Sequence, residues 1–307
     1  MTEQPAFRLG TRGSPLALAQ AHETRERLLA AHGWAEDAVV IEVIRTTGDR
    51  IRDRPLSEVG GKGLFTKELE EALLGGRIDA AVHSMKDMPT ELPDGLAIAA
   101  TLPREDPRDA FLSPVADAPG ALPPDAIVGS SSLRRQAQLR HRRPDLRVVM
   151  FRGNVETRLN KLAAGEVHAT LLAHAGLRRL GLADRVTRTL EPEEMLPAVA
   201  QGAICLEVAQ GGTAPETVAA LNHPETSIAT AAERAFLAVL DGSCRTPIAG
   251  LALLDGDEIW LRGEIIRPDG SERIAVERRG PAADAIRLGA DAGEEARRRA
   301  GPGFFDG

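Results

Sequence analysis

Residues 80–89 read AAVHSMKDMP, an apolar run that ends in polar residues and a proline. A short apolar run is typical of a strand covered on both faces, and Pro89 biases the residue before it away from helix. Ser84, Lys86 and Asp87 are therefore predicted to lie at the carboxyl end of a strand, where open α/β sheets bind their ligands. For a Lys-Asp pair alone a solvated loop is the better interpretation, so the rest of the chain has to support a site here.

The chain before this strand predicts a β-α-β-α order. Residues 7–15 read FRLGTRGSP, which indicates a short strand, a turn and a helix start with Ser14 as the N-cap. This helix is expected to end at Gly33. A β-branched strand over 39–45 and a helix over about 66–74 follow. With the strand at residue 80 the order becomes β-α-β-α-β, which favours an α/β domain.

The middle of the chain repeats a strand, a polar cap and a helix three times. The strands are predicted at 126–129, 147–151 and 169–172. Arg134 and Arg135 fall in the first turn of a helix, where each opposes the macrodipole by a few tenths to about 1 kcal/mol. Pairing with surface acids would explain one arginine at such a position. A site that binds carboxylates through planar guanidinium groups would explain several of them. The arginines taken as one set are Arg12, Arg134, Arg135, Arg152, Arg158 and Arg179. As a set they imply a small molecule that carries several negative charges.

The last third of the chain changes character. The segment 190–207, with two prolines, indicates a crossing between domains, and its end, from residue 203, reads as a strand that returns to the first sheet. A helix over 227–240, three strands and a terminal helix then predict an α+β module, with strands at 248–254, 258–266 and 273–278. The fold class is therefore α/β, with two α/β domains and a third, smaller α+β domain. The predicted limits are 1–102 with 200–220, 103–199, and 221–307.

Composition limits the class of protein. The formal net charge of −7 over 307 residues argues against nucleic acid as the main partner. No apolar run reaches the length of a membrane span, and no secretory pattern precedes the first strand. Cys205 and Cys244 are the two cysteines, which favours free thiols and a cytoplasmic location. The glycine-rich run 60–63 lacks the spacing of a phosphate loop, and a mobile lid is the alternative.

The two cysteines have different surroundings. Cys205 falls inside an apolar strand and is expected to be buried. Cys244 follows Gly242-Ser243 and precedes Arg245, a setting that favours reactivity. A quiet loop thiol and a covalent attachment point are both consistent with this loop. No metal pair is indicated, because neither a histidine nor a second cysteine is near it in sequence.

Several motifs together resemble the porphobilinogen deaminase family over nearly the whole chain. They are TRGSPLAL at 11–18, GGKGLF at 60–65, HSMKDMP at 83–89, GSSSLRR at 129–135, RGNV at 152–155, AGL at 175–177 and the cysteine loop at 244. The resemblance implies two domains like periplasmic binding proteins around a cleft, and a third domain that carries a dipyrromethane cofactor on a cysteine thioether. By motif position that cysteine is Cys244.

The resemblance also implies a function. Such an enzyme joins four porphobilinogen molecules head to tail, loses ammonia each time, and releases hydroxymethylbilane. Asp87 is then the catalytic carboxylate. The cofactor-binding residues are expected to be Cys244, Lys86, Ser132, Arg134, Arg135 and Ser84. The substrate-binding residues are expected to be Arg12, Ser14, Arg152, Arg158, Arg179 and Phe65. No metal is expected, the partner is the small-molecule substrate, and the chain is expected to be a monomer.

Three positions depart from the usual pattern of the family. Ser243 and Ala200 stand where glycine is common, and Cys205 stands where a small residue without a thiol is typical. Two other functions compete with the enzyme. A receptor or effector related to binding proteins would share the two α/β lobes but needs no reactive cysteine. A different thiol enzyme would use Cys244 as a nucleophile with a distant base such as His83 or His174.

Overall fold

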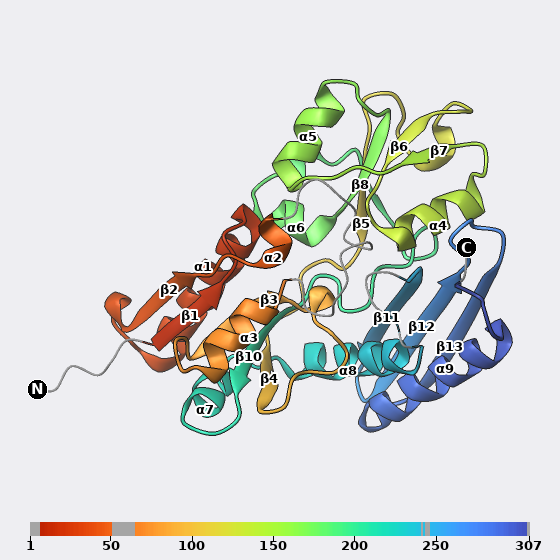
Figure 1. Ribbon diagram of the computed structural model, residues 1–307. Coiled ribbons are helices and arrows are strands. Elements are labelled where there is room, and N and C mark those ends of the chain that lie inside the picture. The colour runs from red at the N-terminus through yellow and green to blue at the C-terminus, as the bar shows by residue number, and fades with distance from the viewer. Residues whose placement is uncertain (1–6, 51–64, 241, 243–245, 306–307) are drawn as a thin grey trace, which may run out of the picture. The chain divides into compact units, whose positions relative to one another are not determined.

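The computed structural model describes residues 7–50, 65–240, 242 and 246–305 (Figure 1). The chain divides into two compact units, described here one at a time. The first unit comprises Met1–Arg104 and Ala203–Ser227, and the second unit comprises Glu105–Gly202 and Ile228–Gly307.

The first unit contains a five-stranded sheet in the order β2-β1-β3-β10-β4. Strand β1 is parallel to β2 and β3, whereas β10 is antiparallel to β3 and β4. The strands are β1 (Phe7–Thr11), β2 (Val39–Val43), β3 (Ala80–Ser84), β4 (Leu96–Thr101) and β10 (Ile204–Ala209). The helices are α1 (Pro15–His32), α2 (Thr47–Arg50), α3 (Lys67–Leu74) and α7 (Ala214–Ala219), with single 3-10 turns η1 (Glu36–Ala38) and η2 (Met85–Asp87).

Helix α1 has the ends that its sequence predicts. The Ser14 hydroxyl accepts a hydrogen bond from the Ala17 amide at 3.2 Å, as an N-cap does. Gly33 ends the helix with φ of 63°, a left-handed conformation that glycine adopts without a Cβ clash. Apolar side chains of α1, such as Leu28, pack against one face of the sheet, and those of α3, such as Leu69, pack against the other. The strand β3 is therefore covered on both faces, as predicted.

The second unit contains another five-stranded sheet, in the order β7-β6-β8-β5-β9. Strand β6 is parallel to β7 and β8, and β5 is antiparallel to β8 and β9. The strands are β5 (Asp109–Leu112), β6 (Ile127–Gly129), β7 (Arg147–Val149), β8 (Ala169–Ala173) and β9 (Arg188–Leu190). The helices are α4 (Leu133–Arg142), α5 (Val155–Ala163) and α6 (His174–Arg179), with 3-10 turns η3 (Pro119–Ala121) and η4 (Ala183–Arg185). The thrice-repeated strand, cap and helix are confirmed as β6-α4, β7-α5 and β8-α6.

The two sheets share one topology. Each has three parallel strands followed by an antiparallel strand in fourth place, namely β10 in the first unit and β5 in the second. Each of these strands directly follows a passage of the chain from one unit to the other. The sequence patterns predicted the return of β10 but did not identify β4, β5 and β9, because none of these three strands is followed directly by an α-helix with a cap that marks its end.

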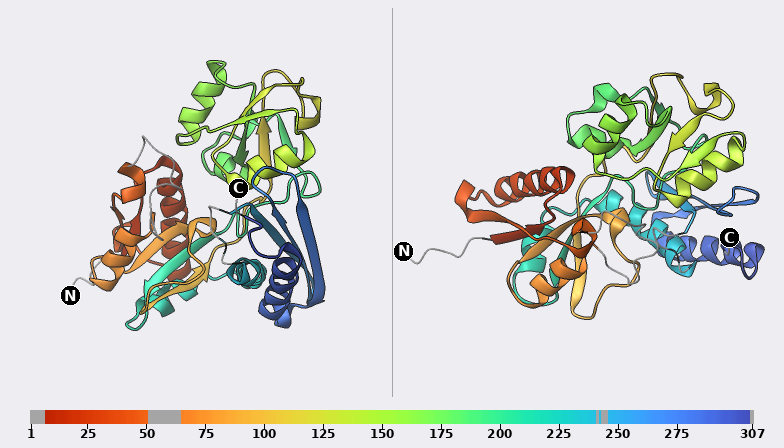
Figure 2. Two further views of the ribbon diagram at one scale, coloured as in Figure 1. Left: turned by 45° about the vertical axis from the view of Figure 1, so that its right-hand side comes forward. Right: turned by 45° about the horizontal axis from the view of Figure 1, so that its top comes forward.

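The C-terminal part of the second unit is an antiparallel sheet of three strands, in the order β11-β12-β13. Helices α8 and α9 pack on one face of this sheet (Figure 2), and their residues share one hydrophobic core with it. Gly263 lets the Phe236 ring approach, since a Cβ there would lie 2.6 Å from the ring. The elements are α8 (Pro224–Val239), β11 (Ile248–Asp255), β12 (Glu258–Ile266), β13 (Arg273–Pro281), η5 (Ala282–Asp284) and α9 (Ala285–Ala300). The predicted α+β arrangement is confirmed.

The fold class is thus two α/β sheets and a smaller α+β part. The predicted limits of the three domains stay a prediction. Within the described residues, no helix is both long enough and apolar enough to cross a membrane.

Candidate functional site

The turn after β3 presents the predicted polar residues. Asp87 is exposed at the end of η2, and Lys86 beside it is half-buried. The Met85 amide donates to the Ala203 carbonyl at 3.0 Å, which ties the turn to the chain entering β10. The Ser84 hydroxyl lies 2.8 Å from Nε2 of Gln20, a buried side chain of α1. Ser84 therefore anchors the turn, an interaction that the sequence patterns did not reveal.

Two further predicted residues meet in the first unit. The guanidinium carbon of Arg12 lies 4.0 Å from the centroid of the Phe65 ring, which is a cation-π contact. Arg12 follows β1 directly and precedes the N-cap Ser14. The predicted cover residues 60–63 lie outside the described residues.

In the second unit, Arg134 and Arg135 both bind a single buried carboxylate. Arg134 Nη1 lies 2.7 Å from Asp109 Oδ2, and Arg135 Nη2 lies 2.7 Å from Asp109 Oδ1. Gln201 Nε2 donates to Oδ1 of the same carboxylate at 2.9 Å. Asp109 is the first residue of β5, so the antiparallel fourth strand supplies this acid.

The charge of Asp109 is stabilised strongly by its neighbours. Burial alone raises the pKa of Asp109, but the charges and hydrogen bonds of Arg134 and Arg135 outweigh it and hold the pKa well below its usual range. The sequence suggested either surface acids or an external anion as partners of Arg134 and Arg135. In the structure both arginines bind the buried Asp109 of the same chain. Arg134 Nε is buried and has no hydrogen-bond partner among the described residues, so this guanidinium keeps one donor for another acceptor.

Arg135 also belongs to a group of arginines with Arg152 and Arg158. Burial lowers the pKa of Arg158 to about 10, and the positive charges of Arg135 and Arg152 lower it further. Among the residues that the structure describes, no acid is one of the groups that act on it. Arg158 Nε donates to the Gly153 carbonyl at 2.9 Å, and Ser132 caps α4 by accepting from the Arg135 amide at 3.4 Å. The structure thus brings Arg135, Arg152 and Arg158 close enough to repel one another.

Another predicted arginine, Arg179 at the end of α6, bonds to the segment of chain before β10. Arg179 Nη1 donates to the Gly202 carbonyl at 3.1 Å. Gly202 has φ of 92°, and a Cβ there would lie 2.3 Å from the Glu105 carbonyl oxygen. Ala200 has φ of 58°, a left-handed conformation that favours the glycine common at this position in the family pattern.

An ion-paired group near α6 was missed by the sequence patterns. Asp106 Oδ2 lies 2.8 Å from Arg108 Nη2 and 3.1 Å from His174 Nδ1. Burial raises the pKa of Asp106, but hydrogen bonds and charge from Arg108, with His174, lower it to about 2. Asp106 and Arg108 lie just before β5, and His174 directly follows β8. No sequence motif marks the three residues as a group.

Of the two cysteines, the structure describes only Cys205. Cys205 is fully buried in β10, as expected. Cys244 lies outside the described residues. Among the residues that are described, no group of three His, Cys, Asp or Glu side chains has the arrangement of a metal site.

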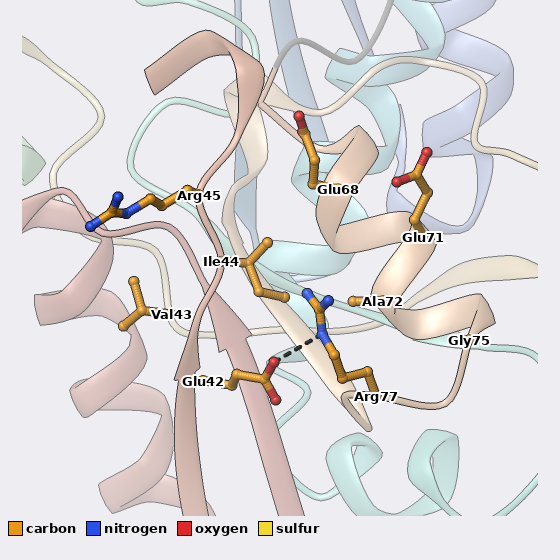
Figure 3. Close-up of a pocket in the computed structure, with 9 residues that line it drawn as sticks. All are labelled: Glu42, Val43, Ile44, Arg45, Glu68, Glu71, Ala72, Gly75 and Arg77. Atoms are coloured by element: carbon orange, nitrogen blue, oxygen red, sulfur yellow. Dashed lines mark ion pairs between the residues drawn. The ribbon is translucent and has the colours of Figure 1, made fainter. Parts of the chain in front are cut away.

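A cavity of about 570 Å³ in the first unit contains none of the predicted site residues. It lies between the end of β2 and α3 (Figure 3), where Arg77 Nε pairs with Glu42 at 2.9 Å. Glu68 and Glu71 project from α3 along its edge. This lining contains both acidic and basic residues, unlike the arginine-rich surroundings in the second unit.

Comparison with known proteins decides the family. Residues 7–216 match the family model described as porphobilinogen deaminase, dipyromethane cofactor binding domain, and residues 227–298 match the porphobilinogen deaminase C-terminal domain. The chain belongs to the porphobilinogen deaminase family. A porphobilinogen deaminase of Paracoccus denitrificans is 61% identical over 100% of this chain and 99% of its own length. That of Nitrobacter winogradskyi is 59% identical over 97% of this chain and 94% of its own length.

Solved structures of periplasmic proteins are also similar. The methionine-binding protein MetQ has 10% sequence identity and a TM-score of 0.45, covering 72% of this chain and 92% of its own. The family assignment rests on the sequence matches. It makes the family motifs at 83–89 and 129–135 the relevant ones, and these are the residues that the structure places at the end of β3 and at the start of α4.

Proposed function

We propose that this protein condenses four molecules of porphobilinogen head to tail, with loss of ammonia in each step, and releases the linear tetrapyrrole hydroxymethylbilane. Family membership over the whole chain supports the reaction. The single observation that carries the proposal is the grouping of Arg135 and Arg152 around Arg158. Burial, and then the charges of Arg135 and Arg152, lower the pKa of Arg158, and no acid of the described residues is among the groups that act on it. Porphobilinogen carries an acetate and a propionate, so a growing chain brings the negative charges that such a group needs.

A dipyrromethane cofactor fits the described residues. Its carboxylates need buried donors that lack an acceptor, and Arg134 Nε is one. Lys86, Ser84, Ser132, Arg134 and Arg135 would hold it, with Cys244 forming the thioether. Asp109 would keep the two guanidinium groups of α4 in place for this purpose. When bound, the dipyrromethane supplies the free pyrrole carbon to which the first substrate unit is joined.

Asp87 is the catalytic residue of the proposal. Loss of ammonia from porphobilinogen leaves a cationic azafulvene, and a carboxylate beside it stabilises the charge and accepts pyrrole N–H hydrogen bonds. The same carboxylate helps to move the proton that is lost after the new bond forms. Asp87 is exposed at the end of η2 and is therefore accessible to such a substrate. Lys86 beside it offsets the repulsion between Asp87 and the substrate carboxylates.

The remaining assignments follow from charge and position. Arg12 directly follows β1, at the carboxyl end of that strand, and its guanidinium group contacts the Phe65 ring. We assign the substrate carboxylates and ring to Arg12, Ser14, Arg152, Arg158, Arg179 and Phe65. We further propose that the protein is a monomer in the cytoplasm. The third domain, at 221–307, would carry Cys244.

The intact mass of the purified, denatured protein tests the proposal. We expect a mass excess equal to two linked pyrrole units in the native chain and in a Cys205→Ala control, and no excess in Cys244→Ala. The native chain is then expected to gain further porphobilinogen units on incubation with substrate. A bare chain mass that stays unchanged with porphobilinogen would contradict the proposal and favour a protein that only binds ligands.

A further inference from the structure

The strand β3 carries a buried polar pair that the proposed chemistry does not use. His83 Nε2 lies 3.0 Å from Glu207 Oε2, and the two side chains are 4% and 0% exposed. His83 is opposite Cys205 and Glu207 is opposite Ala81 in the antiparallel pairing of β3 with β10. Directly opposed side chains of antiparallel strands lie on the same face of a sheet. The pair therefore links β3 to β10 on the face that α3 covers.

This face contains more buried oxygen atoms than hydrogen-bond donors to meet them. Glu207 Oε1 and Glu70 Oε1 are both buried without a hydrogen-bond partner in the described part of the chain. A second ionised carboxylate in such a layer is costly unless it is paired. Burial raises the pKa of Glu70, the Thr66 hydroxyl lowers it, and the charge of Glu207 raises it again. Glu70 is therefore the carboxyl group that favours holding a proton here.

The other charged groups on this face are already paired or lie at its edges. Arg8 on β1 pairs with Asp79 at 2.8 Å, and Glu42 on β2 pairs with Arg77 at 2.9 Å. Glu68, in the first turn of α3, accepts from the Thr47 amide at 2.8 Å. The pair of His83 and Glu207 thus links the side chains of the central strand β3 and its neighbour β10 in this layer.

The pair is placed directly before the catalytic turn. β3 ends at Ser84 and η2 begins at Met85, so His83 is the last fully buried side chain of the strand before the turn. On the opposite face Ser84 is tied to Gln20, and the Met85 amide is tied to Ala203. The strand end is consequently fixed from both faces. An apolar pair would fill the same space without the cost of desolvating a carboxylate.

We propose that His83 and Glu207 are positioning residues, which hold the end of β3 against β10 so that Lys86 and Asp87 keep their productive place. This inference rests on the proposed function, because it concerns the geometry of its catalytic carboxylate. The pair has no contact with substrate in this scheme and acts only through the backbone of β3. A displacement of about 1 Å at a reacting group can lower a rate by about 100-fold.

The test replaces both partners by apolar residues in the double variant His83→Leu/Glu207→Leu. Removing both partners leaves no uncompensated buried charge, so the protein is expected to stay folded with little change in its melting temperature. We expect kcat for porphobilinogen consumption to fall at least tenfold, while KM changes less than threefold. Backbone amide exchange at Met85 and Met88 is expected to accelerate at least tenfold relative to Leu9 in β1.

A matched control is Lys67→Gln/Glu71→Gln, which removes a pair on the exposed side of α3. It is expected to leave kcat and amide exchange unchanged. A folded His83→Leu/Glu207→Leu protein with wild-type kcat would overturn the inference while the proposed function stood. A wild-type protein that does not consume porphobilinogen would overturn the proposed function itself. If the double variant does not fold, Glu207→Gln replaces it, with the same expected fall in kcat at constant KM and the same reading of an unchanged kcat.

Discussion

Arg134 and Asp109 form a buried ion pair in which Nη1 lies 2.7 Å from Oδ2. The second oxygen of the carboxylate binds Arg135, so one acid orders two neighbouring guanidinium groups. Arg134 also donates to the Leu196 carbonyl at 2.8 Å, on the crossing toward β10. The arrangement makes Asp109 a support for the proposed cofactor site as well as a structural residue.

Asp109→Asn is expected to destabilise the protein strongly. The change removes the carboxylate charge that two buried guanidinium groups share, and breaking a buried pair in this way costs about 3–5 kcal/mol. Urea unfolding at pH 7 measures the loss. Asp145→Asn is the control, because its pair with Arg143 also measures 2.7 Å but is far more exposed. That control is expected to lose much less stability, because water screens an exposed pair, and equal losses would show that burial does not set the difference.

Arg158→Gln is expected to separate stability from function. The variant removes a cation that Arg135 and Arg152 repel, so the free energy of unfolding should fall by no more than about 0.5 kcal/mol. If Arg158 binds substrate carboxylates, KM for porphobilinogen should rise at least tenfold. Steady-state kinetics and urea unfolding give the two values. Arg147→Gln, at an exposed position of β7, should change neither, and an unchanged KM in Arg158→Gln would remove this residue from the site.

Asp87→Asn should lower kcat at least about 100-fold, because the amide neither stabilises a cation nor moves a proton as a carboxylate does. Its stability should stay within about 0.5 kcal/mol of the wild type, since the side chain is exposed. Ammonia release measures the rate. Asp94→Asn, also exposed in the first unit, serves as the control. Near-normal turnover in Asp87→Asn would place the electrostatic centre elsewhere.

Asp106 should make stability depend on acid pH. Its pKa is about 2 in the folded protein, well below the value of about 3.9 in an unfolded chain. The resulting stabilisation is present above about pH 4 and is lost as the pH falls through the folded pKa; in full it amounts to about 2 kcal/mol. Urea unfolding of wild type and Asp106→Asn should therefore differ at pH 7 and converge toward pH 2. A difference that stays constant with pH would show that the charge of Asp106 is not its cause.

Gly202→Ala should be far more damaging than Gly181→Ala. Both glycines have positive φ, 92° and 67°, so each alanine introduces backbone strain of about 1–2 kcal/mol. Only at Gly202 would the added Cβ also meet a backbone oxygen, at 2.3 Å, whereas nothing lies within 4 Å at Gly181. Thermal unfolding of the two variants compares the effects. Similar melting temperatures would mean that the crossing shifts freely at Glu105.

The order of strands and helices followed from sequence patterns to a large extent. The caps at Ser14 and Gly33, the strand that ends at Ser84 and the three strand-helix repeats are all local features. Hydrophobic periodicity and capping depend on residues a few positions apart, so they can be read without the fold. The strands β4, β5 and β9 lack such a signal, because none of them leads directly into a capped α-helix.

The sequence by itself determined the fold class, the family motifs and the position of Asp87 at the end of a strand. Only the tertiary structure decided which groups compensate the buried charges. Asp109 precedes Arg134 by 25 residues, and His83 and Glu207 are 124 residues apart. Antiparallel pairing of the fourth strand in each sheet brings these groups together. No local pattern encodes such a meeting, because it depends on which strands become neighbours and in which register they pair.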